Sequence, residues 1–485
     1  MTTIFLLLSI VATPLASQDP IDSARAVIKR LMAERGIPSV TVAATKGGRV
    51  VWEEGFGWAD KERRIAATAT TMYSLASISK PITATGVMVQ VTRGRVRLDR
   101  PANDYLGPGK LTAREGKAAD ATVRLVANHT AGLPLHYQFF YVDRAARRPS
   151  MDQAIAHYGI LVAPPGTQFT YSNLGFGILE RIIERSSGTE FAAFMRREVF
   201  EPLGLPRMAV VTGPIGGDTV AVRYDEQGAP IPWYDFDHRG ASAVYSSAHD
   251  LARFGMFHLG DGLADQRAIL DRAALDTMHR ATVRRAEHVG YGIGWQTFDA
   301  DNGYVSLGHS GGMPGVATVF RIYPEADAVV VVLMNGADND AGNRIAAAVG
   351  ATLMPRMAER IRNAPSPAAA TARFEPGADL IGGWTGLITT WQGTLAMTLS
   401  ISSDGTTRAT VAGGEAAAVT NPRWQNGRLT GSLAGAMPTP DASREPGSLA
   451  FDVRLHDGRL SGSVSALGTN VYALSSYVSL KRRPR

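Results

Sequence analysis

The chain has 485 residues, of which 45% are hydrophobic and 19% are charged. This composition is typical of a folded globular protein, and the length is sufficient for two or three domains with full cores. Because the chain contains no cysteine, disulfides, thiolate metal sites and thiol catalysis are excluded. The 50 basic and 44 acidic residues give a net charge of +6, but the basic residues are dispersed and form no recognisable nucleic-acid-binding module, so we expect no nucleic-acid partner.

The N-terminus contains an apolar run from Ile4 to Ala16. A run of this length is typical of a signal peptide and is too short to cross a bilayer. No later segment reaches transmembrane length without charges or glycines. We therefore expect a signal peptide over residues 1–18, no membrane span after its removal, and a secreted or periplasmic bacterial protein.

The first predicted elements are a helix and a hairpin. The pattern from Ser23 to Arg35 predicts an opening helix. Two predicted strands follow, Val40–Ala44 and Val50–Glu54, and the glycines between them indicate a hairpin. The next predicted helix contains Ser77 and ends near Gly94.

Helical patterns and long loops fill residues 120–290, and strand patterns return from Tyr291 onward. Two strands are predicted at Val316–Tyr323 and Ala328–Met334, and a helix over Asn343–Arg362 follows them. Strands at both ends with helices between them predict the α+β class, with an antiparallel sheet built from distant segments. We assign residues 21–362 to this domain.

The sequence pattern changes after residue 362. Residues 363–374 are rich in proline and alanine and predict a linker. Residues 375–485 contain short alternating runs separated by turn pairs such as Asn426-Gly427 and Asp457-Gly458, which predict a separate all-β domain, a small closed barrel. Its tryptophans are expected in the barrel core rather than at a ligand-binding mouth: Trp384, Trp391 and Trp424.

Ser77 and Lys80 form the most informative pair in the chain, because no other lysine has a serine three residues before it. Residues at i and i+3 lie on the same face of a helix, so the hydroxyl is expected beside the amine. This places a nucleophile next to a base, provided that the amine can lose its proton. The pattern alone is weak evidence, since a chain of this length contains about one or two by chance.

Two further segments carry polar groups suited to a site. Tyr171 and Asn173 lie two residues apart in a turn-rich loop that leads into a helix predicted from Ile178. The segment Gly308–Gly312 contains His309 and precedes a predicted strand, and its glycines allow a backbone to approach a ligand closely.

At these three places the chain resembles the serine β-lactamase and penicillin-binding protein superfamily, above all its branch of class C β-lactamases, D,D-peptidases and esterases. The resemblance covers residues 25–360. It implies a β-lactamase/transpeptidase-like antiparallel sheet with a helical domain, followed here by a lipocalin-like barrel. Three motifs and three of the flanking segments carry it: Ser77–Lys80, Tyr171–Asn173, His309–Gly311, Asn128–Pro134, Tyr245–Phe254 and Tyr291–Trp295.

The resemblance implies roles for the motif residues. Ser77 would attack an acyl carbon and form an acyl-enzyme, while Lys80, made neutral by burial, would take the Ser77 proton. Tyr171 would relay protons to the leaving group and then activate the hydrolytic water. Asn173 would hold Lys80 in place.

The third motif would bind the substrate. Backbone N–H groups of Ser77 and Gly312 would form an oxyanion hole, in which each donor is typically worth about 3 kcal/mol. Ser310 and Gly311 are expected to line the substrate site beside His309. The substrate is expected to be a small molecule or a peptide, and no metal or cofactor is implied.

His309 departs from the β-lactamases of this branch, which carry a lysine at this position. A histidine is mostly neutral at pH 7 and supplies no permanent cation for a substrate carboxylate. The substitution resembles that in D-amino-acid peptidases and esterase-like relatives. We therefore expect a serine hydrolase of the carboxylesterase or D-amino-acid peptidase type, acting on an ester or a small amide or peptide. A β-lactamase or a penicillin-binding D,D-carboxypeptidase is the alternative.

Other interpretations were weaker. Gly308–Gly312 also fits the nucleophile elbow of α/β-hydrolases, but that motif needs a helix directly after its serine, and a strand is predicted here. A sensor that is acylated without turnover is less favoured, and the oligomeric state stays open. We hypothesise that the barrel narrows substrate choice. Four histidines lack zinc-motif spacing and are interpreted as loop or helix-surface residues: His129, His136, His249 and His258.

Overall fold

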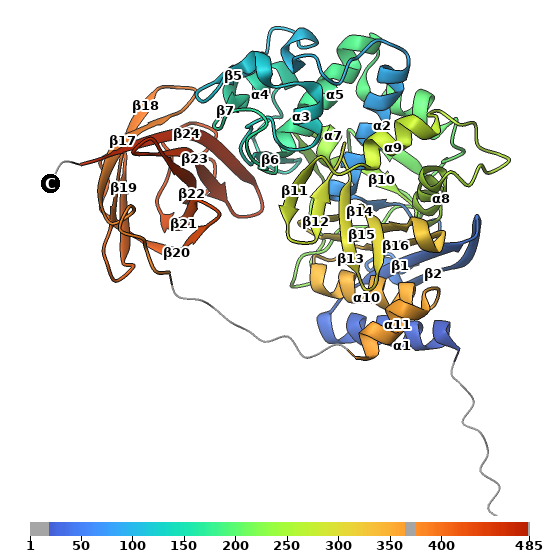
Figure 1. Ribbon diagram of the computed structural model, residues 1–485. Helices are drawn as coiled ribbons and strands as arrows, with labels where there is room; N and C mark the ends of the chain where they lie inside the picture. The colour runs from blue at the N-terminus through green and yellow to red at the C-terminus, as the bar shows by residue number, and fades with distance from the viewer. Residues whose placement is uncertain (1–18, 364–373, 484–485) are drawn as a thin grey trace, which may run out of the picture.

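The computed structural model describes residues 19–363 and 374–483. It consists of an α+β body and, beside it, a barrel formed by the last strands of the chain (Figure 1). The expected signal peptide, residues 1–18, lies outside the described residues, as does the expected linker apart from its two end residues. None of the helices in the described part is long and apolar enough to cross a membrane.

The α+β body is built on an antiparallel sheet that joins distant segments. Its strands, in spatial order, are β11 (Val283–Ala286), β12 (Val289–Tyr291), β13 (Gln296–Asp301), β14 (Tyr304–Met313), β15 (Val316–Tyr323), β16 (Ala328–Met334), β1 (Ser39–Lys46), β2 (Arg49–Asp60) and β3 (Ile65–Ala66). The predicted hairpin is confirmed between β1 and β2. At the centre β1 pairs with β16, so the two ends of the body meet in one sheet, as the α+β prediction required.

Helices cover both faces of this sheet (Figure 1). Successive residues of a strand point to opposite faces, and every residue of β16 is buried. Val330 and Val332 belong to the apolar cluster of α1 (Pro20–Arg35) and α10 (Asn339–Ala351), whereas Val329 and Val331 belong to the cluster that contains α8 (Ala248–Leu259).

The helix predicted over Asn343–Arg362 is wrong in its extent. The structure has two helices here, α10 and α11 (Pro355–Arg362), separated by a short turn. Pro355 explains the break, because proline lacks an N–H donor and disfavours the helical conformation in the residue before it. Met354 accordingly adopts φ −128° and ψ 97°.

The helical region lies over the α8 face of the sheet and is centred on α2 (Ser79–Thr92), nearly all of which is buried. The other helices are α3 (Val123–Ala127), α4 (Met151–Tyr158), α5 (Asn173–Ser187), α6 (Phe191–Met195), α7 (Arg239–Ser242) and α9 (Arg272–His279). Short strands connect them: β4 (Tyr73–Ser74), β5 (Thr112–Ala113), β6 (Tyr137–Tyr141), β7 (Ile160–Leu161), β8 (Met208–Val210), β9 (Tyr234–Phe236) and β10 (Val244–Ser246).

The C-terminal strands form the closed barrel that the sequence predicted. They are β17 (Gly382–Thr389), β18 (Thr394–Ile401), β19 (Thr407–Val411), β20 (Ala417–Gln425), β21 (Arg428–Ala434), β22 (Gly447–His456), β23 (Arg459–Gly468) and β24 (Tyr472–Arg482). Each pairs with the next, and β17 closes the barrel against β24. Trp384 is buried in the core as expected, but Trp391 is 37% exposed and stacks on His157 of the α+β body.

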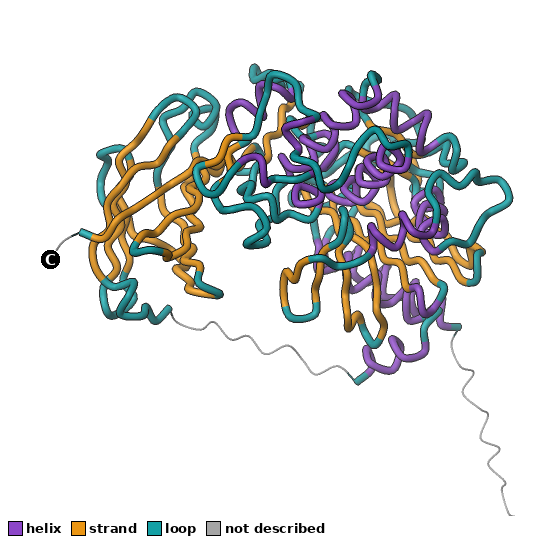
Figure 2. The backbone as a smooth tube through the Cα atoms, turned by 45° about the horizontal axis from the view of Figure 1, so that its top comes forward, coloured by secondary structure: helices purple, strands orange, loops and turns teal. Residues whose placement is uncertain are grey.

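The barrel is joined to the α+β body by strand pairing. The barrel strand β24 pairs with β6 of the body, and β6 pairs with β9. One hydrogen-bonded sheet therefore extends from the barrel into the α+β body. Figure 2 shows the barrel strands beside the helical region. Tyr477 Oη donates to Glu115 Oε1 at 2.6 Å, and Ser475 Oγ donates to Leu135 O. These contacts hold the barrel beside the loop that contains Leu135.

Candidate active site

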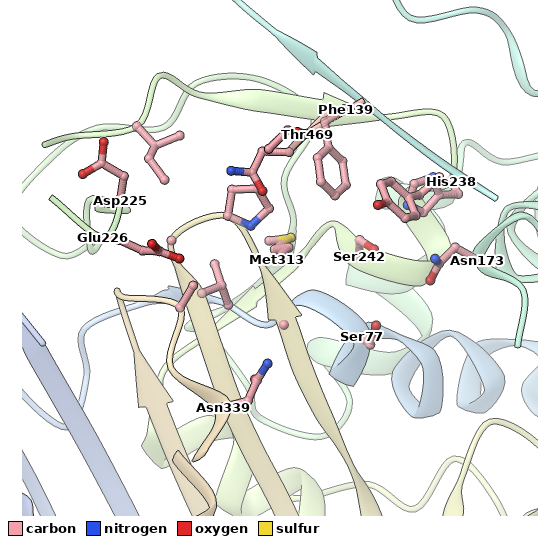
Figure 3. Close-up of a pocket in the computed structure, with 18 of the residues that line it drawn as sticks. Ser77, Phe139, Asn173, Asp225, Glu226, His238, Ser242, Met313, Asn339 and Thr469 are labelled. Carbon is pink, nitrogen blue, oxygen red and sulfur yellow. The ribbon is translucent and has the colours of Figure 1, made fainter. Parts of the chain in front are cut away.

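Ser77 lies in a 3-10 turn, Ala76–Ile78, directly before α2. Ala76 has a φ of 48°, a left-handed conformation that residues other than glycine rarely adopt. Two hydrogen bonds anchor Leu75, the residue before this turn. Thr318 Oγ1 donates to Leu75 O at 3.0 Å, and Leu75 N donates to Val244 O at 2.9 Å. Ser77 faces a cavity of about 630 Å³ (Figure 3).

Lys80 is the fully buried neighbour of this hydroxyl, with 0% exposure. Its Nζ lies 3.0 Å from Ser77 Oγ and 2.8 Å from Asn173 Oδ1, and it also contacts Ala241 O at 3.3 Å. Burial lowers the pKa of Lys80 well below its ordinary value of 10.5, and none of these partners is a carboxylate that would stabilise the charge. A neutral amine in this position can accept the Ser77 proton.

Tyr171 approaches the same hydroxyl. Its Oη donates to Ser77 Oγ at 3.0 Å, and its ring centre lies 4.8 Å from Lys80 Nζ. Burial raises the pKa of Tyr171 above its usual range, so the phenol keeps its proton at neutral pH. Ser77 therefore contacts a base on one side and an acid on the other.

Asn173 is placed by the start of a helix. It is the first residue of α5, and the side chain of the capping residue Ser172 accepts from Gly175 N at 3.3 Å. The helix thus begins within the second motif, earlier than the start expected at Ile178. This beginning directs the Asn173 side chain to Lys80.

The third motif lies in β14, beside the turn that carries Ser77. A Cβ on Gly311 would lie 2.2 Å from Leu75 O, so only glycine permits this close approach of the strand. Gly312 lines the same cavity as Ser77. The structure therefore brings together the residues that the sequence singled out in three separate segments.

A chain of hydrogen bonds links the second motif to the third. Ser172 N donates to His129 Nδ1 at 3.2 Å, and His129 Nε2 lies 3.2 Å from Tyr291 Oη. Tyr291 Oη lies 3.2 Å from His309 Nε2, and His309 Nδ1 lies 2.7 Å from the carbonyl oxygen of Ser310.

The direction of each of these hydrogen bonds follows from the groups at the two ends of the series, Ser172 N–H and the Ser310 carbonyl. A backbone N–H can only donate and a carbonyl can only accept, so His129 donates to Tyr291, Tyr291 donates to His309, and His309 Nδ1–H donates to Ser310 O. In this arrangement both imidazoles are neutral. Burial is the largest cause that lowers the pKa of both His129 and His309 well below 6.5, in agreement with that assignment.

Ser310 is placed in a strand rather than in a nucleophile elbow. It lies within β14, pairs with Val319 of β15, and its Oγ accepts from Arg321 Nη2 at 3.2 Å. No helix follows it directly, which agrees with our preference for Ser77 as the nucleophile.

The interpretation of the four histidines as loop or helix-surface residues was wrong for His258, which is buried on α8, whereas His129 and His136 lie in loops as interpreted. His129, His136 and His258 are buried, with exposures of 3%, 0% and 2%. Only His249, which lies 2.7 Å from Glu53 Oε2, has a substantially exposed side chain. Sequence spacing tests for zinc motifs but cannot detect a neutral histidine that is hydrogen-bonded in a core.

A buried carboxylate that the sequence analysis missed lies beside the cavity. Asp237 Oδ2 lies 2.6 Å from His136 Nε2, and Asp237 Oδ1 lies 2.5 Å from His238 Nδ1. His238 lines the cavity near Asn173 (Figure 3). In the described part of the chain, no group of three histidine, aspartate or glutamate side chains is arranged to hold a metal ion.

The barrel supplies part of the cavity wall. Thr469 and Asn470, in the turn between β23 and β24, line the cavity that Ser77 faces. Figure 3 shows Thr469 in the cavity wall. A second cavity of about 620 Å³ shares Tyr171 and Gly312 with the first and is lined by His309 and by the barrel residue Arg428. Residues of the barrel therefore line both of the cavities that Tyr171 lines.

The sequence is similar to those of known penicillin-binding proteins. A penicillin-binding protein 4 from Amycolatopsis lactamdurans is 29% identical over 325 residues, which cover 63% of this chain and 83% of that protein. A penicillin-binding protein from Bacillus subtilis (strain 168) is 25% identical over 318 residues, or 61% of this chain and 67% of that protein.

Solved structures with lower identity show the same fold. SurE matches with a TM-score of 0.64 and 21% identity over 94% of this chain and 99% of its own. A class C β-lactamase matches with a TM-score of 0.60 and 19% identity over 69% and 96% of the two chains. The hydrolase EstCE1 matches with a TM-score of 0.58 and 20% identity over 68% and 98%.

Together, the fold, the site and these relatives define a serine hydrolase of the α+β class. The family model described as Beta-lactamase matches residues 24–353. The chain belongs to the β-lactamase family.

Proposed function

We propose that the chain hydrolyses an ester or a small amide or peptide through an acyl-enzyme on Ser77, as a carboxylesterase or a D-amino-acid peptidase would. The Ser77 proton passes to Lys80 Nζ while Ser77 Oγ bonds to the acyl carbon. The carbonyl oxygen becomes an oxyanion that the backbone N–H groups of Ser77 and Gly312 stabilise. The distances around Ser77 Oγ support this assignment.

The leaving group departs with a proton from Tyr171, and Lys80 returns its proton to Tyr171. Water then attacks the acyl-enzyme and gives one proton, through Tyr171, to Lys80. The bond between Ser77 and the acyl carbon breaks, Ser77 regains its proton, and the acid is released. Asn173 holds Lys80 in place, and Ser310 and Gly311 line the substrate site beside His309.

The observation that favours an ester or a small amide as the substrate is that the imidazole of His309 is neutral. Its only N–H is given to the Ser310 carbonyl, and its Nε2 accepts from Tyr291, so the third motif contributes no cation. A penicillin carboxylate would lack the permanent charge that lysine supplies there. The alternative, a β-lactamase or D,D-carboxypeptidase, is favoured by the relatives that are named penicillin-binding proteins.

The test is mass spectrometry of the intact protein and its peptides after brief incubation with a fluorophosphonate and, separately, with a penicillin. We expect a phosphonate adduct on the Ser77 peptide and a penicillin adduct that is absent or long-lived. Rapid loss of the penicillin adduct would instead identify a β-lactamase. An adduct on Ser310, or none anywhere, would contradict the proposal, and a burst without steady-state hydrolysis of any ester would indicate an acylated sensor.

We also propose that the chain is exported, with residues 1–18 removed, and that residues 21–362 and 375–485 are separate domains joined by residues 363–374. The apolar run from Ile4 to Ala16 supports the first statement. N-terminal sequencing of the mature protein would contradict it by finding Met1.

A further inference from the structure

A buried imidazole of the Ser77 cavity has one ring nitrogen that no other residue binds. His238 lines this cavity, and its side chain is only 1% exposed. Its Nδ1 lies 2.5 Å from Asp237 Oδ1, whereas its Nε2 has no hydrogen-bond partner in the described part of the chain. Because a buried polar atom without a partner is costly, the unpaired Nε2 points to a group that enters the cavity and binds there.

The hydrogen bonds of Asp237 fix the proton of His238. Asp237 Oδ1 also accepts from Gln138 N at 3.2 Å, while Oδ2 accepts from Gln138 Nε2 at 2.9 Å and lies 2.6 Å from His136 Nε2. Burial by itself would raise the pKa of Asp237, but its two histidine partners, His136 first, hold it below its usual range. An ionised carboxylate can only accept, so the proton of His238 is on Nδ1.

His238 therefore presents a hydrogen-bond acceptor to the cavity. Burial lowers the pKa of His238 below 6.5, so the ring is neutral at pH 7. A neutral imidazole with its proton on Nδ1 carries a lone pair on Nε2. The negative charge of Asp237 behind the ring strengthens the attraction of this lone pair for a donor, and most of all for a donor with a positive charge.

The barrel helps to orient this acceptor. Arg444, in the segment between β21 and β22, donates from Nη2 to Gln138 Oε1 at 2.8 Å. Because this bond occupies the oxygen of the Gln138 amide, the amide nitrogen is turned towards Asp237. A series of hydrogen bonds thus runs from Arg444 through Gln138 and Asp237 to His238, and the ring of Phe236 packs against His238 with the ring centres 5.6 Å apart.

The charges around the same cavity favour a cation. Asp225 and Glu226 line it, and none of the described residues that line it is an arginine or a lysine. Asp225 Oδ1 accepts from the backbone N–H groups of Gln227 and Ala229 at 3.0 Å and 2.8 Å, whereas Glu226 forms no hydrogen bond or ion pair within the described ranges. Figure 3 shows both carboxylates and His238 in the wall of this cavity. Their negative potential attracts a positively charged donor.

We propose that His238 Nε2 accepts a hydrogen bond from a protonated amine on the substrate, so that the preferred esters, amides or peptides carry an ammonium group. An ammonium group has three donors and no acceptor, which suits a neutral imidazole with a carboxylate behind it. This inference rests on the proposed function and names the substrate class of that site.

The test uses two pairs of esters in which an aminomethyl group is compared with a hydroxymethyl group of similar shape. The first pair carries the group on the acyl part, as phenyl esters of 3-(aminomethyl)phenylacetic and 3-(hydroxymethyl)phenylacetic acid. The second pair carries it on the leaving group, as phenylacetates of 3-(aminomethyl)phenol and 3-(hydroxymethyl)phenol. Each ratio of kcat/KM values is divided by the ratio of the hydroxide-catalysed rates, which removes differences in intrinsic reactivity.

We expect the wild-type protein to prefer the amine in one of the two pairs, and that pair identifies the end of the substrate that meets His238. In His238→Asn this preference falls about tenfold, the size typical of one lost hydrogen bond to a charged group. The asparagine amide reaches the position of Nδ1, so it keeps a donor for Asp237 but places nothing at Nε2. In His238→Gln the amide reaches the position of Nε2, and part of the preference is retained.

His249→Asn is the matched control, because it changes a histidine that is bound to Glu53 outside this cavity, and its ratios stay at the wild-type values. Thermal unfolding checks that each variant is folded. Wild-type ratios near one in both pairs, or unchanged ratios in His238→Asn, would overturn the inference, while hydrolysis of the hydroxymethyl esters still supported the proposed function. Failure of the wild-type protein to hydrolyse any of the four esters would overturn both.

Discussion

Burial prepares the two groups beside Ser77 for opposite tasks. Removal from water disfavours the charged form of any side chain, which lowers the pKa of Lys80 and raises that of Tyr171. At neutral pH this favours a free amine on one side of Ser77 Oγ and an intact phenol on the other. One physical cause thus yields a base and an acid within 3.0 Å of the same oxygen.

We predict that Tyr171→Phe lowers kcat about 100-fold or more, because proton transfer by a positioned group contributes at least that factor. The fold should be retained, since the ring stays in place. Steady-state kinetics and thermal unfolding measure both effects. Tyr158→Phe is the control, because it removes a buried hydroxyl that has no hydrogen-bond partner. Near-normal turnover in Tyr171→Phe would refute the role of Tyr171.

The pH dependence of kcat/KM is predicted to reflect the buried amine. Because burial lowers the pKa of Lys80, the free base is present well below pH 10.5, and the acidic limb of the profile should lie there too. Lys80→Arg should be inactive across the profile, because a guanidinium does not lose its proton. A rate that rises steadily to pH 10 would show an ordinary lysine and contradict the assignment.

At the scale of elements, α7 connects α2 to α5. Gly240 N donates to Glu180 Oε2 of α5 at 2.8 Å, and Thr83 Oγ1 of α2 donates to Gly240 O at 2.7 Å. The next residue of α7, Ala241, places its carbonyl oxygen beside Lys80 Nζ. The buried carboxyl of Glu180 therefore helps to position α7 and, through it, Lys80.

Burial raises the pKa of Glu180 from 4.5 to about 8. Between these values the folded protein binds a proton that the unfolded chain has lost, so the free energy of unfolding falls as the pH rises. Glu180→Gln cannot titrate and should keep the bond to Gly240. We predict that its stability relative to wild type increases by about 2–4 kcal/mol between pH 5 and pH 8.

Urea unfolding at pH 5, 6.5 and 8 measures this difference. The control is Glu201→Gln, which changes an exposed carboxylate paired with Arg196 and should show no such trend. A stability difference in Glu180→Gln that does not depend on pH would show that Glu180 titrates normally.

At the scale of the whole molecule, the barrel forms part of the wall of the cavity that Ser77 faces. Tyr141 Oη donates to Asn470 O at 2.8 Å and so anchors the turn between β23 and β24 at the cavity. Thr469 and Asn470 of this turn line the same cavity as Ser77. This placement supports the hypothesis that the barrel narrows substrate choice.

We predict that Thr469→Trp lowers kcat/KM for phenylacetyl esters about tenfold more than for acetyl esters of the same alcohol, because a bulky side chain would leave less room for the larger acyl group in the cavity that Ser77 faces. Ser403→Trp is the control, since this residue lies in the turn between β18 and β19, outside both cavities. Equal effects on the two esters would leave the barrel without a role in acyl selection.

Local patterns in the sequence predicted the features that depend only on the backbone geometry of a few neighbouring residues. The spacing of Ser77 and Lys80, the hairpin of β1 and β2, and the turns at Asn426 and Asp457, whose φ values of 53° and 47° are left-handed, follow from backbone geometry. The break between α10 and α11 was also readable at Pro355 but was missed, because the hydrophobic pattern continues across it.

The sequence by itself determined which segments form the candidate active site and that a barrel follows the α+β body, because periodicity, turn residues and motif order are properties of short segments. Tertiary structure alone decided the rest. The neutrality of His309 comes from Tyr291 and Ser310, and the cavity wall from a strand pairing between β24 and β6. Burial and partners from distant segments set these properties, and no local pattern records them.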